Sequence, residues 1–374
     1  MGPASQPLPA DASALIDRIA SEAAVTDVRG VQRSTIDALA AEGLLGAPLE
    51  PVSHQRELAE RLAMADGSVW FCWTQHFGCM RVLESAQVGD LTPNARGLQD
   101  RWLAGLTTGS DLGALAFAHV RRPGPPNPIA VRVDGGWVVD GRLDWVTSWD
   151  IADVVMIMVR GSGDWADHFV TFYLPAGHAQ EPLPVGMHVE PPLHLLAMGG
   201  THTRPVVFTG VRIDDACVSS VQPVDAWVER DRRTVSDAGP AIFGVIRGAV
   251  ADLASLSHQQ EAVELAEEIS ALGRALRSRA YALADADGDP AERREVRAAS
   301  LDLAARAAQA VVVARSGGAM LTGTSAERRL REAMFLQVQA QTADVRAAQL
   351  RLIRTGIEAD SDTPAAVSMR TAQV

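Results

Sequence analysis

The sequence contains two patterns that could hold a metal ion, and both depart from the spacing that a metal requires. Cys72, Cys79 and Cys217 are the three cysteines, and they show no paired zinc spacing. Cys72 and Cys79 lie in an apolar stretch, which is typical of reduced core thiols. The tract 285–290 alternates acids like a calcium loop, but Pro290 stands where that loop needs glycine, and no glutamate closes it. We therefore expect no metal site, and an exposed turn at 285–290.

A histidine inside an apolar helix is the next candidate for chemistry. The apolar run that starts after Asp66 predicts a helix with Asp66 or Ser68 as its cap. The polar residues Thr74, Gln75 and His76 inside this run must find hydrogen-bond partners or a wet cavity. Two interpretations follow: a core histidine whose hydrogen bonds are satisfied, or a residue that borders a substrate pocket.

The composition and charge exclude several classes of protein. The 374 residues are 47% hydrophobic, enough for two or three domains with large cores. A net charge of -12 makes nucleic acid and an anionic membrane unsuitable partners. The sequence shows neither a run of roughly 18 apolar residues that could span a bilayer nor the basic and then apolar start of a signal peptide. These features predict a soluble cytoplasmic protein.

The hydrophobic period changes twice along the chain and divides it into three parts. Apolar residues recur at helical spacing in the first hundred residues and again after residue 228, whereas the middle part alternates with period two. This division predicts separate helical and β-domains. The expected boundaries are 1–107 for an N-terminal helical domain, 108–222 for a central β-domain, 223–358 for a C-terminal helical bundle and 359–374 for a polar, flexible tail.

The stretch 135–159 is the most informative part of the middle third. Residues 137–139 and 143–147 are rich in β-formers, and Asp-Gly at 140–141 between them predicts a hairpin turn. The apolar run 151–159 predicts a strand buried on both faces. From its period alone, this stretch would be an ordinary antiparallel core.

Its residue pattern is more specific than its period. Gly-Trp-x-x-x-Gly-x-x-x-Trp-Val-Thr-Ser, followed by Ala-Asp, resembles the central β-domain of the acyl-CoA dehydrogenase superfamily. In that family a Trp-[Ile/Val]-Thr-[Ser/Asn] strand lies against the flavin ring, so the resemblance implies that Trp145, Thr147 and Ser148 face a flavin. A strand edge can offer an N–H group and a hydroxyl to the polar rim of such a ring, while a Trp covers its face.

The resemblance implies a fold, a cofactor and an assembly. The fold would be α+β, with an N-terminal helical domain, a central antiparallel β-domain and a C-terminal four-helix bundle. The cofactor would be FAD, with FMN as an alternative, and the substrate a small molecule such as an acyl-CoA. Because the family buries apolar bundle faces between subunits, we expect a homodimer or homotetramer, or a heteromer with an active paralogue.

The resemblance also assigns further residues to the cofactor and the substrate. Phe117 and Ala118 correspond to the first flavin strand, although the Pro-rich loop 121–128 replaces the acidic, Gly-rich turn that usually follows it. Gly317 and Gly318 correspond to the family's Gly-Gly turn, and with Thr342 they would lie near the cofactor across a subunit interface. The implied cofactor positions are Phe117, Ala118, Trp145, Thr147, Ser148, Gly317, Gly318 and Thr342. The implied substrate-pocket positions are His76, His119, Arg233 and Gln339.

The residue that would remove the substrate's proton is missing. Acyl-CoA dehydrogenation needs a carboxylate to take the proton α to the thioester while hydride passes to the flavin. In the largest branch of the family this Glu lies nine residues past an Arg-Asp-Ala arginine, and here Ala340 stands in its place. A second branch carries its Glu before an Arg at the start of the bundle, where Arg232 and Arg233 stand. A one-residue change of register would bring in Asp231 or Asp237 instead.

A second family feature is also missing. Members usually carry Arg-x-x-Phe-Gly between the first two bundle helices, where the arginine reaches the FAD pyrophosphate of a neighbouring subunit. Here the helical stretch 249–257 passes directly into residues 258–260, about a dozen residues shorter. A neutral residue does not replace the charge-assisted hydrogen bonds of that arginine, so we expect weaker FAD binding.

Three functions remain open at this point. The first is an acyl-CoA dehydrogenase-like flavoenzyme with a relocated base, acting on an unidentified thioester. The second is a non-catalytic subunit of a heteromeric acyl-CoA dehydrogenase. The third is a flavin-dependent monooxygenase, a branch that commonly has His where Gln339 stands; His76 or His119 could substitute for it.

Overall fold

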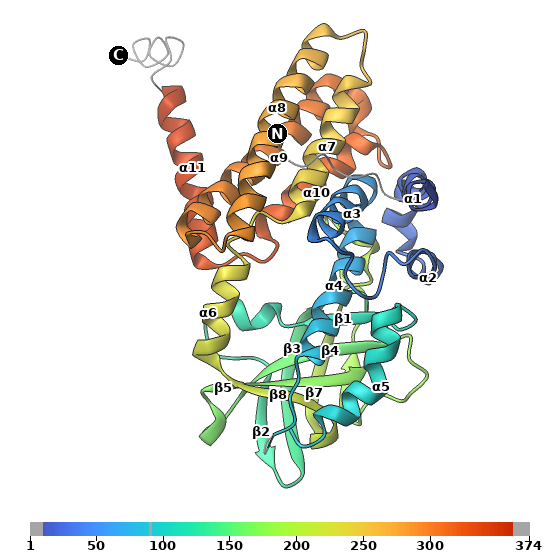
Figure 1. The fold of residues 1–374 in the computed structure, drawn as a ribbon, viewed down its shortest axis with the longest axis vertical. Coiled ribbons are helices and arrows are strands. Elements are labelled where there is room, and N and C mark those ends of the chain that lie inside the picture. The colour runs from blue at the N-terminus through green and yellow to red at the C-terminus, as the bar shows by residue number, and fades with distance from the viewer. Residues whose placement is uncertain (1–9, 90–91, 362–374) are drawn as a thin grey trace.

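The computed structural model describes residues 10–89 and 92–361. A β-sheet lies at one end of the molecule and a helical bundle at the other, with the N-terminal helices beside them (Figure 1). This arrangement confirms the expected α+β fold class. None of the helices in the described part of the chain is long and apolar enough to cross a membrane.

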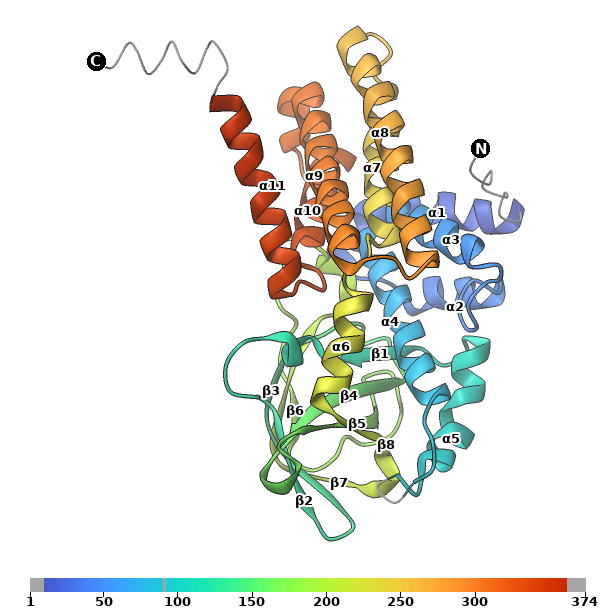
Figure 2. The same cartoon turned by 60° about the vertical axis from the view of Figure 1, so that its left-hand side comes forward.

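Five helices form the N-terminal part: α1 (Ala10–Arg29), α2 (Arg33–Ala41), α3 (Val52–Ala65), α4 (Gly67–Glu84) and α5 (Ala95–Thr108). Helix α4 runs from the level of the bundle down to the sheet in both views (Figures 1 and 2). Its apolar side is buried: the Trp73 indole donates to the Leu44 carbonyl at 2.6 Å and meets the Phe77 ring edge-on at 4.6 Å. Asp66 caps this helix as expected, because its Oδ1 accepts from the backbone N–H of Ser68 and Val69.

The eight strands form one sheet with the order β6-β7-β3-β2-β4-β5-β8, and β1 pairs with β4. The strands are β1 (Gly113–Ala116), β2 (Ile129–Val133), β3 (Gly136–Val146), β4 (Val154–Gly161), β5 (His168–Pro175), β6 (Met187–Val189), β7 (Arg204–Asp214) and β8 (Val218–Pro223). The sheet is mixed rather than wholly antiparallel, because β1 and β2 both run parallel to β4. The apolar run predicted as a doubly buried strand is β4, which begins at Val154.

The hairpin predicted at residues 140–141 is wrong, because a second Asp-Gly pair six residues earlier forms the turn instead. The turn between β2 and β3 uses the earlier pair, Asp134 and Gly135, with Val133 opposite Gly136. Strand β3 continues through Gly141, where a bulge shifts its register against β7. Gly141 has a φ of +126°, which a side chain disfavours.

The C-terminal part consists of α6 (Val224–Thr234), α7 (Pro240–Ala254), α8 (Gln260–Asp285), α9 (Pro290–Arg315), α10 (Ser325–Val338) and α11 (Ala343–Ser361). Helices α7 to α10 pack side by side, and α11 lies against α9 at the edge (Figure 2). The acidic tract forms the turn between α8 and α9, where Asp285 pairs with Arg56 and Asp287 with Arg293. The predicted flexible tail lies outside the described residues from 362 onward, and α11 continues to Ser361.

We predict that Gly141→Ala destabilises the protein more than Gly124→Ala. An added Cβ at Gly141 would lie 2.7 Å from the Pro128 Cα and 2.1 Å from the Asn127 Oδ1, whereas at Gly124, also with positive φ (+109°), it meets nothing within 4 Å. Strain alone costs roughly 1–3 kcal/mol, and the backbone clash should add a similar amount. Chemical denaturation measures the difference; equal losses would contradict the assignment of Gly141 to a crowded bulge.

Candidate functional site

At the end of β3 an indole points outward and the hydroxyls point inward. Trp145 is 46% exposed, although Trp is a large apolar residue. Thr147 and Ser148 are buried, and the Thr147 hydroxyl lies 3.2 Å from that of Thr203. Ser148 has a φ of +66°, and its N–H donates to the Thr201 carbonyl at 2.9 Å. The indole of Trp145 is therefore accessible at the end of β3, whereas the Ser148 Oγ is buried without a hydrogen-bond partner among the described residues.

After β1, the chain is covered by α6. The Phe117 ring meets the Trp227 ring of α6 edge-on at 6.2 Å, and the Arg121 guanidinium lies 4.9 Å from the Phe117 ring centre. Arg121 also forms a bidentate ion pair with Asp231 of α6, at 2.8 and 2.6 Å. Ala118 opens the short 3₁₀ helix that carries Arg121. Phe117 thus packs beneath α6.

The Pro-rich loop covers a pocket of about 630 Å³, named here the Pro-loop pocket. Its lining includes His119, the loop from Arg122 to Pro128, Arg142, Asp144, Arg160 and Ser162. Burial lowers the pKa of His119 to about 4, so this imidazole is neutral at physiological pH. Its Nε2 is buried without a hydrogen-bond partner within the described residues.

The Pro-loop pocket carries more positive than negative charge, in a protein whose net charge is -12. Arg122 and Arg142 both contact Asp144, and Arg142 also contacts Glu190. Partial burial opposes ionisation of Asp144, but hydrogen bonds from the two arginines hold its pKa below the usual value. Arg160 donates to the Ala166 carbonyl and has no carboxylate among its described contacts. The excess positive charge makes this pocket suited to an anion.

A second pocket, of about 660 Å³, lies between the end of α4 and the start of α6. Ser219 and Ser220 of β8 line it, together with Met158, Trp227 and Arg230. It presents hydroxyls and one guanidinium. It is less charged than the Pro-loop pocket.

The expected base position has no acid, and the two substitutes are already paired. Ala340 lies in the turn between α10 and α11 with a φ of +49°, and the buried Arg297 holds this turn by donating to the Gln339 carbonyl at 2.7 Å. Asp231 is bound by Arg121, and Asp237 is bound by Arg293 at 2.6 and 2.8 Å. Both aspartates accept bidentate hydrogen bonds, so neither presents a free carboxylate to a substrate.

Other predicted site residues lie apart from one another. Arg233 is 56% exposed at its side chain and pairs with Glu229 and Asp287. Thr342 opens α11, where its hydroxyl accepts from the Val345 N–H. Gly317 and Gly318 follow the far end of α9, a helix of 26 residues or roughly 39 Å. Within one chain, these glycines therefore cannot join the residues around α6.

Of the two interpretations of His76, the structure supports a core histidine whose hydrogen bonds are satisfied over a residue of the substrate pocket. It is fully buried, its Nε2 donates to the Leu106 carbonyl at 2.9 Å, and its Nδ1 accepts from the Gly113 N–H at 3.3 Å. Both ring nitrogens are satisfied by the neutral imidazole. Burial lowers its pKa to about 4.

The sequence did not indicate the arginines that make the Pro-loop pocket positive, nor the arginine that holds the turn at Ala340. Arg142 and Arg160 lie on different strands, β3 and β4, and only the sheet brings them beneath the Pro-rich loop. The adjacent Arg121 and Arg122 before that loop were the available sequence signal. Arg297 shows no local motif, since its role comes from the tertiary contact with residue 339.

Solved structures with the same fold are found at low sequence identity. Butyryl-CoA dehydrogenase from Megasphaera elsdenii matches with a TM-score of 0.72 at 16% identity, covering 94% of this chain and 100% of that one. Acyl-CoA dehydrogenase from Geobacillus kaustophilus gives 0.72 at 13%, covering 94% and 100%. A glutaryl-CoA dehydrogenase from Mycobacterium smegmatis in complex with FADH2 gives 0.71 at 14%, covering 92% and 95%.

The described helices and the mixed sheet thus define a three-part α+β architecture, and the matches extend over nearly its whole length. The fold is that of the acyl-CoA dehydrogenase superfamily. Neither a comparison with protein-family models nor one with curated protein sequences finds a match.

We predict that His76 contributes stability at neutral pH that is lost in acid. Because its folded pKa is lowered from 6.5 to about 4, the contribution is complete above pH 6.5 and disappears as the pH falls through 4. The full difference is about 3 kcal/mol. Denaturation of wild type and His76→Gln at pH 7 and pH 4 should show the smaller acid loss in the variant, with His188→Gln, at an exposed site on β6, as control. Parallel pH profiles for wild type and His76→Gln would contradict it.

Proposed function

We propose that the chain is a flavin-dependent oxidoreductase subunit that binds an acyl thioester but has no carboxylate base at the usual position. The observation that carries this proposal is the turn at Ala340, together with the engagement of Asp231 and Asp237 by arginines. The fold supports the reaction class, since butyryl-CoA dehydrogenase and acyl-CoA dehydrogenase share it.

The Pro-loop pocket supports an anionic substrate. A coenzyme A thioester carries phosphates, and planar guanidinium groups bind phosphate with paired hydrogen bonds. Arg160 is the best placed of the three arginines, because Arg122 and Arg142 share Asp144. The neutral His119 in the same pocket adds a polar group with a free ring nitrogen.

Trp145 supports FAD as the cofactor, with FMN as the alternative. The glutaryl-CoA dehydrogenase match is a complex with FADH2. In this chain the exposed indole of Trp145 would cover one face of the ring, while the hydrogen bonds of Ser148 and Thr203 hold the end of the strand in position. A bound flavin supplies a hydride acceptor. The chain's own residues would bind and orient the thioester.

The second candidate is a non-catalytic subunit of a heteromeric acyl-CoA dehydrogenase. The short connection between α7 and α8 favours it: residues 255–259 read Ser-Leu-Ser-His-Gln and contain no arginine for a dinucleotide pyrophosphate. A subunit whose partner supplies both the base and the flavin contacts needs neither of its own. Gln339 does not favour the monooxygenase, a branch that commonly has histidine at this position.

We predict that Ala340→Glu restores proton abstraction that the wild type lacks. A positioned base contributes about 10²–10⁴-fold. The measurement is anaerobic bleaching of the flavin in the FAD-loaded chain by a panel of acyl-CoAs, with Ala340→Gln as the matched control of equal size. Only the Glu variant should bleach.

The results of the bleaching and binding experiments distinguish the flavoenzyme from the non-catalytic subunit. Fast bleaching by wild type would show that a base is present elsewhere and overturn the proposal. Loss of acyl-CoA binding in Arg160→Ala, with FAD content unchanged, supports the pocket assignment. No bleaching by any variant, with FAD retained only after a partner chain is added, supports the non-catalytic subunit.

We also propose that a second copy of the chain covers the apolar face of α10. Leu330, Met334 and Val338 recur every four residues there and are 39%, 44% and 62% exposed. Met320 and Leu321, before α10, are 69% and 65% exposed. Such a contiguous apolar surface is typical of an interface between subunits.

We predict that Met334→Glu with Val338→Glu produces monomers. An unpaired charge buried in an interface costs roughly 2–5 kcal/mol, enough to weaken association by orders of magnitude. Sedimentation at micromolar concentration measures the mass. The control is Val185→Glu, at a 95% exposed site before β6. A monomeric wild type would rule the interface out.

A further inference from the structure

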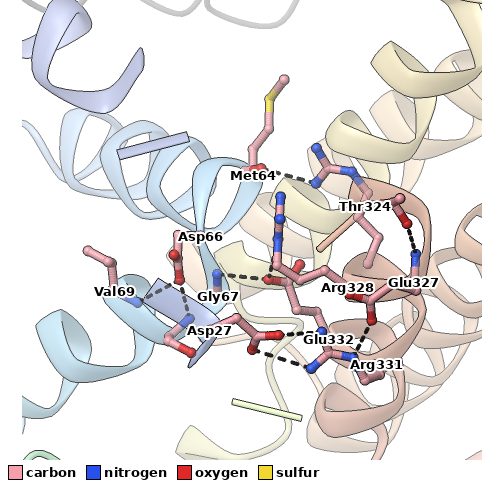
Figure 3. A network of polar contacts seen from close by, with 12 residues as sticks. Asp27, Met64, Asp66, Gly67, Val69, Thr324, Glu327, Arg328, Arg331 and Glu332 are labelled. Atoms are coloured by element: carbon pink, nitrogen blue, oxygen red, sulfur yellow. Dashed lines mark hydrogen bonds and ion pairs between the residues drawn. The ribbon is translucent and has the colours of Figure 1, made fainter. Parts of the chain in front are cut away.

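The N-terminus of α4 is held by two carboxylates that come from distant parts of the chain. The Asp66 Oδ1 accepts from the N–H groups of Ser68 and Val69 at 2.8 and 3.0 Å. The Glu332 Oε1, from α10, accepts from the N–H of Gly67 at 3.0 Å (Figure 3). Residues 66 and 332 thus join the N-terminal helices to the C-terminal bundle at one helix end. We name this contact the α4–α10 joint.

The α4–α10 joint is closed to solvent. Asp66 is 2% and Glu332 3% exposed. A Cβ on Gly67 would lie 2.9 Å from both the Glu332 Oε1 and the Met198 methyl, so both side-chain ends lie close against the start of α4. Two acids are therefore enclosed against one helix end by Met198 and by α10 itself.

Each acid has one oxygen without a partner. The Asp66 Oδ2 and the Glu332 Oε2 are buried and make no hydrogen bond within the described residues. A buried, ionised carboxylate with an unsatisfied oxygen is costly, whereas a protonated one is much less so. The joint therefore favours the uptake of a proton.

Of the arginines that the structure describes near the α4–α10 joint, only Arg328 is not already paired with another carboxylate, so it alone faces the two acids. On α10, the Arg328 Nε lies 3.7 Å from Glu332. Arg329 is engaged by Asp252 of α7 and by the Met64 carbonyl.

The remaining arginine of α10 is already paired with other carboxylates. Arg331 pairs with Asp27 of α1 and with Glu327 (Figure 3). Asp27 adds a further negative charge near Asp66. The positive groups are thus too few, or already paired, to stabilise both carboxylates as anions.

Burial is the largest influence on both acids. It raises the pKa of Glu332 to about 7, against the nearby Arg328 and Arg329 and with the help of Asp66. It raises the pKa of Asp66 to about 6, against the hydrogen bonds from Val69 and Ser68 and the charge of Arg328.

We propose that the α4–α10 joint is a pH-dependent latch, which holds a proton between the N-terminal helices and the bundle and loosens as the pH rises above neutrality. The proton is bound to a carboxylate oxygen in the closed joint and is released to solvent when Gly67 and Glu332 separate. This proposal is independent of the function of the α6 region.

The direction of the effect follows from the sign of the shift. An acid whose pKa is higher in the folded state stabilises folding most below its unfolded value, and this contribution is lost as the pH rises through the folded value. For Glu332 that window runs from about 4.5 to about 7. The unfolding equilibrium constant of the wild type should therefore rise by roughly 100-fold more than that of a non-titrating variant between pH 5 and pH 8.

The test compares wild type with Glu332→Gln. Glutamine keeps an oxygen for the Gly67 N–H and removes the titration. We expect a flatter pH profile of stability for Glu332→Gln, and stability above that of wild type at pH 8. The control is Glu327→Gln, on the same helix, which should keep the wild-type slope. Equal slopes for wild type and Glu332→Gln would overturn the proposal.

A second measurement covers the case in which Glu332→Gln does not fold. Infrared difference spectra of wild type between pH 5 and pH 8 should show the carbonyl band of a protonated carboxylic acid disappear. Asp66→Asn, which keeps a good capping residue, should reduce this band without abolishing it. Absence of the band in wild type at pH 5 would also overturn the proposal. Faster hydrogen exchange at Gly67 above neutrality, beyond the intrinsic pH effect, would place the loosening at the joint.

Discussion

The buried start of α4 constrains the rest of the structure, because the free N–H groups of a helix end need acceptors when water is excluded. Asp66 supplies one carboxylate from the preceding residue, and α10 must bring the second, from Glu332, across 265 positions of sequence. Once this end is fixed, α4 lies over β1, and its Trp73 and His76 enter the core.

A second contact determines what the candidate site can do. Arg121, just after β1, clamps Asp231 of α6, and this places Trp227 against both Phe117 and Phe169. Phe169 lines the Pro-loop pocket and Trp227 lines the second pocket, so α6 runs between the two. The same ion pair removes Asp231 from the set of available bases. One ion pair therefore both shapes the site and withdraws one of the two candidate bases.

Period and residue pattern predicted the three-part fold, because helix and strand spacing depend on local sequence. They failed where two local signals competed: Asp-Gly at 134–135 and at 140–141 are equally good turns, and only pairing with β7 extends β3 through the second. The resemblance placed Ala340 at the base position by counting nine residues from Arg331 of α10 into the following turn, and that assignment stays a prediction. It misplaced His76, because the partners of that ring, Leu106 and Gly113, come from other elements. The role of Glu332 could not be predicted for the same reason: its contact with the start of α4 is a tertiary contact that its own helix does not indicate.

Binding an anionic substrate and removing its proton need different side chains, and this chain offers more groups for the first than for the second. The Pro-loop pocket keeps guanidinium groups where an anion can reach them, and Arg160 has no carboxylate among its described contacts. At the end of α6, by contrast, each of the two candidate bases is matched by an arginine: Asp231 by Arg121 and Asp237 by Arg293. An ion pair of this kind stabilises the link between α6 and its neighbours, and it does so by occupying the lone pairs that a base would use. Under the proposed function, this arrangement supports binding of an anionic substrate more than its deprotonation, which is the role proposed for a subunit that works beside a catalytic partner or with a base supplied from outside its own α6 region.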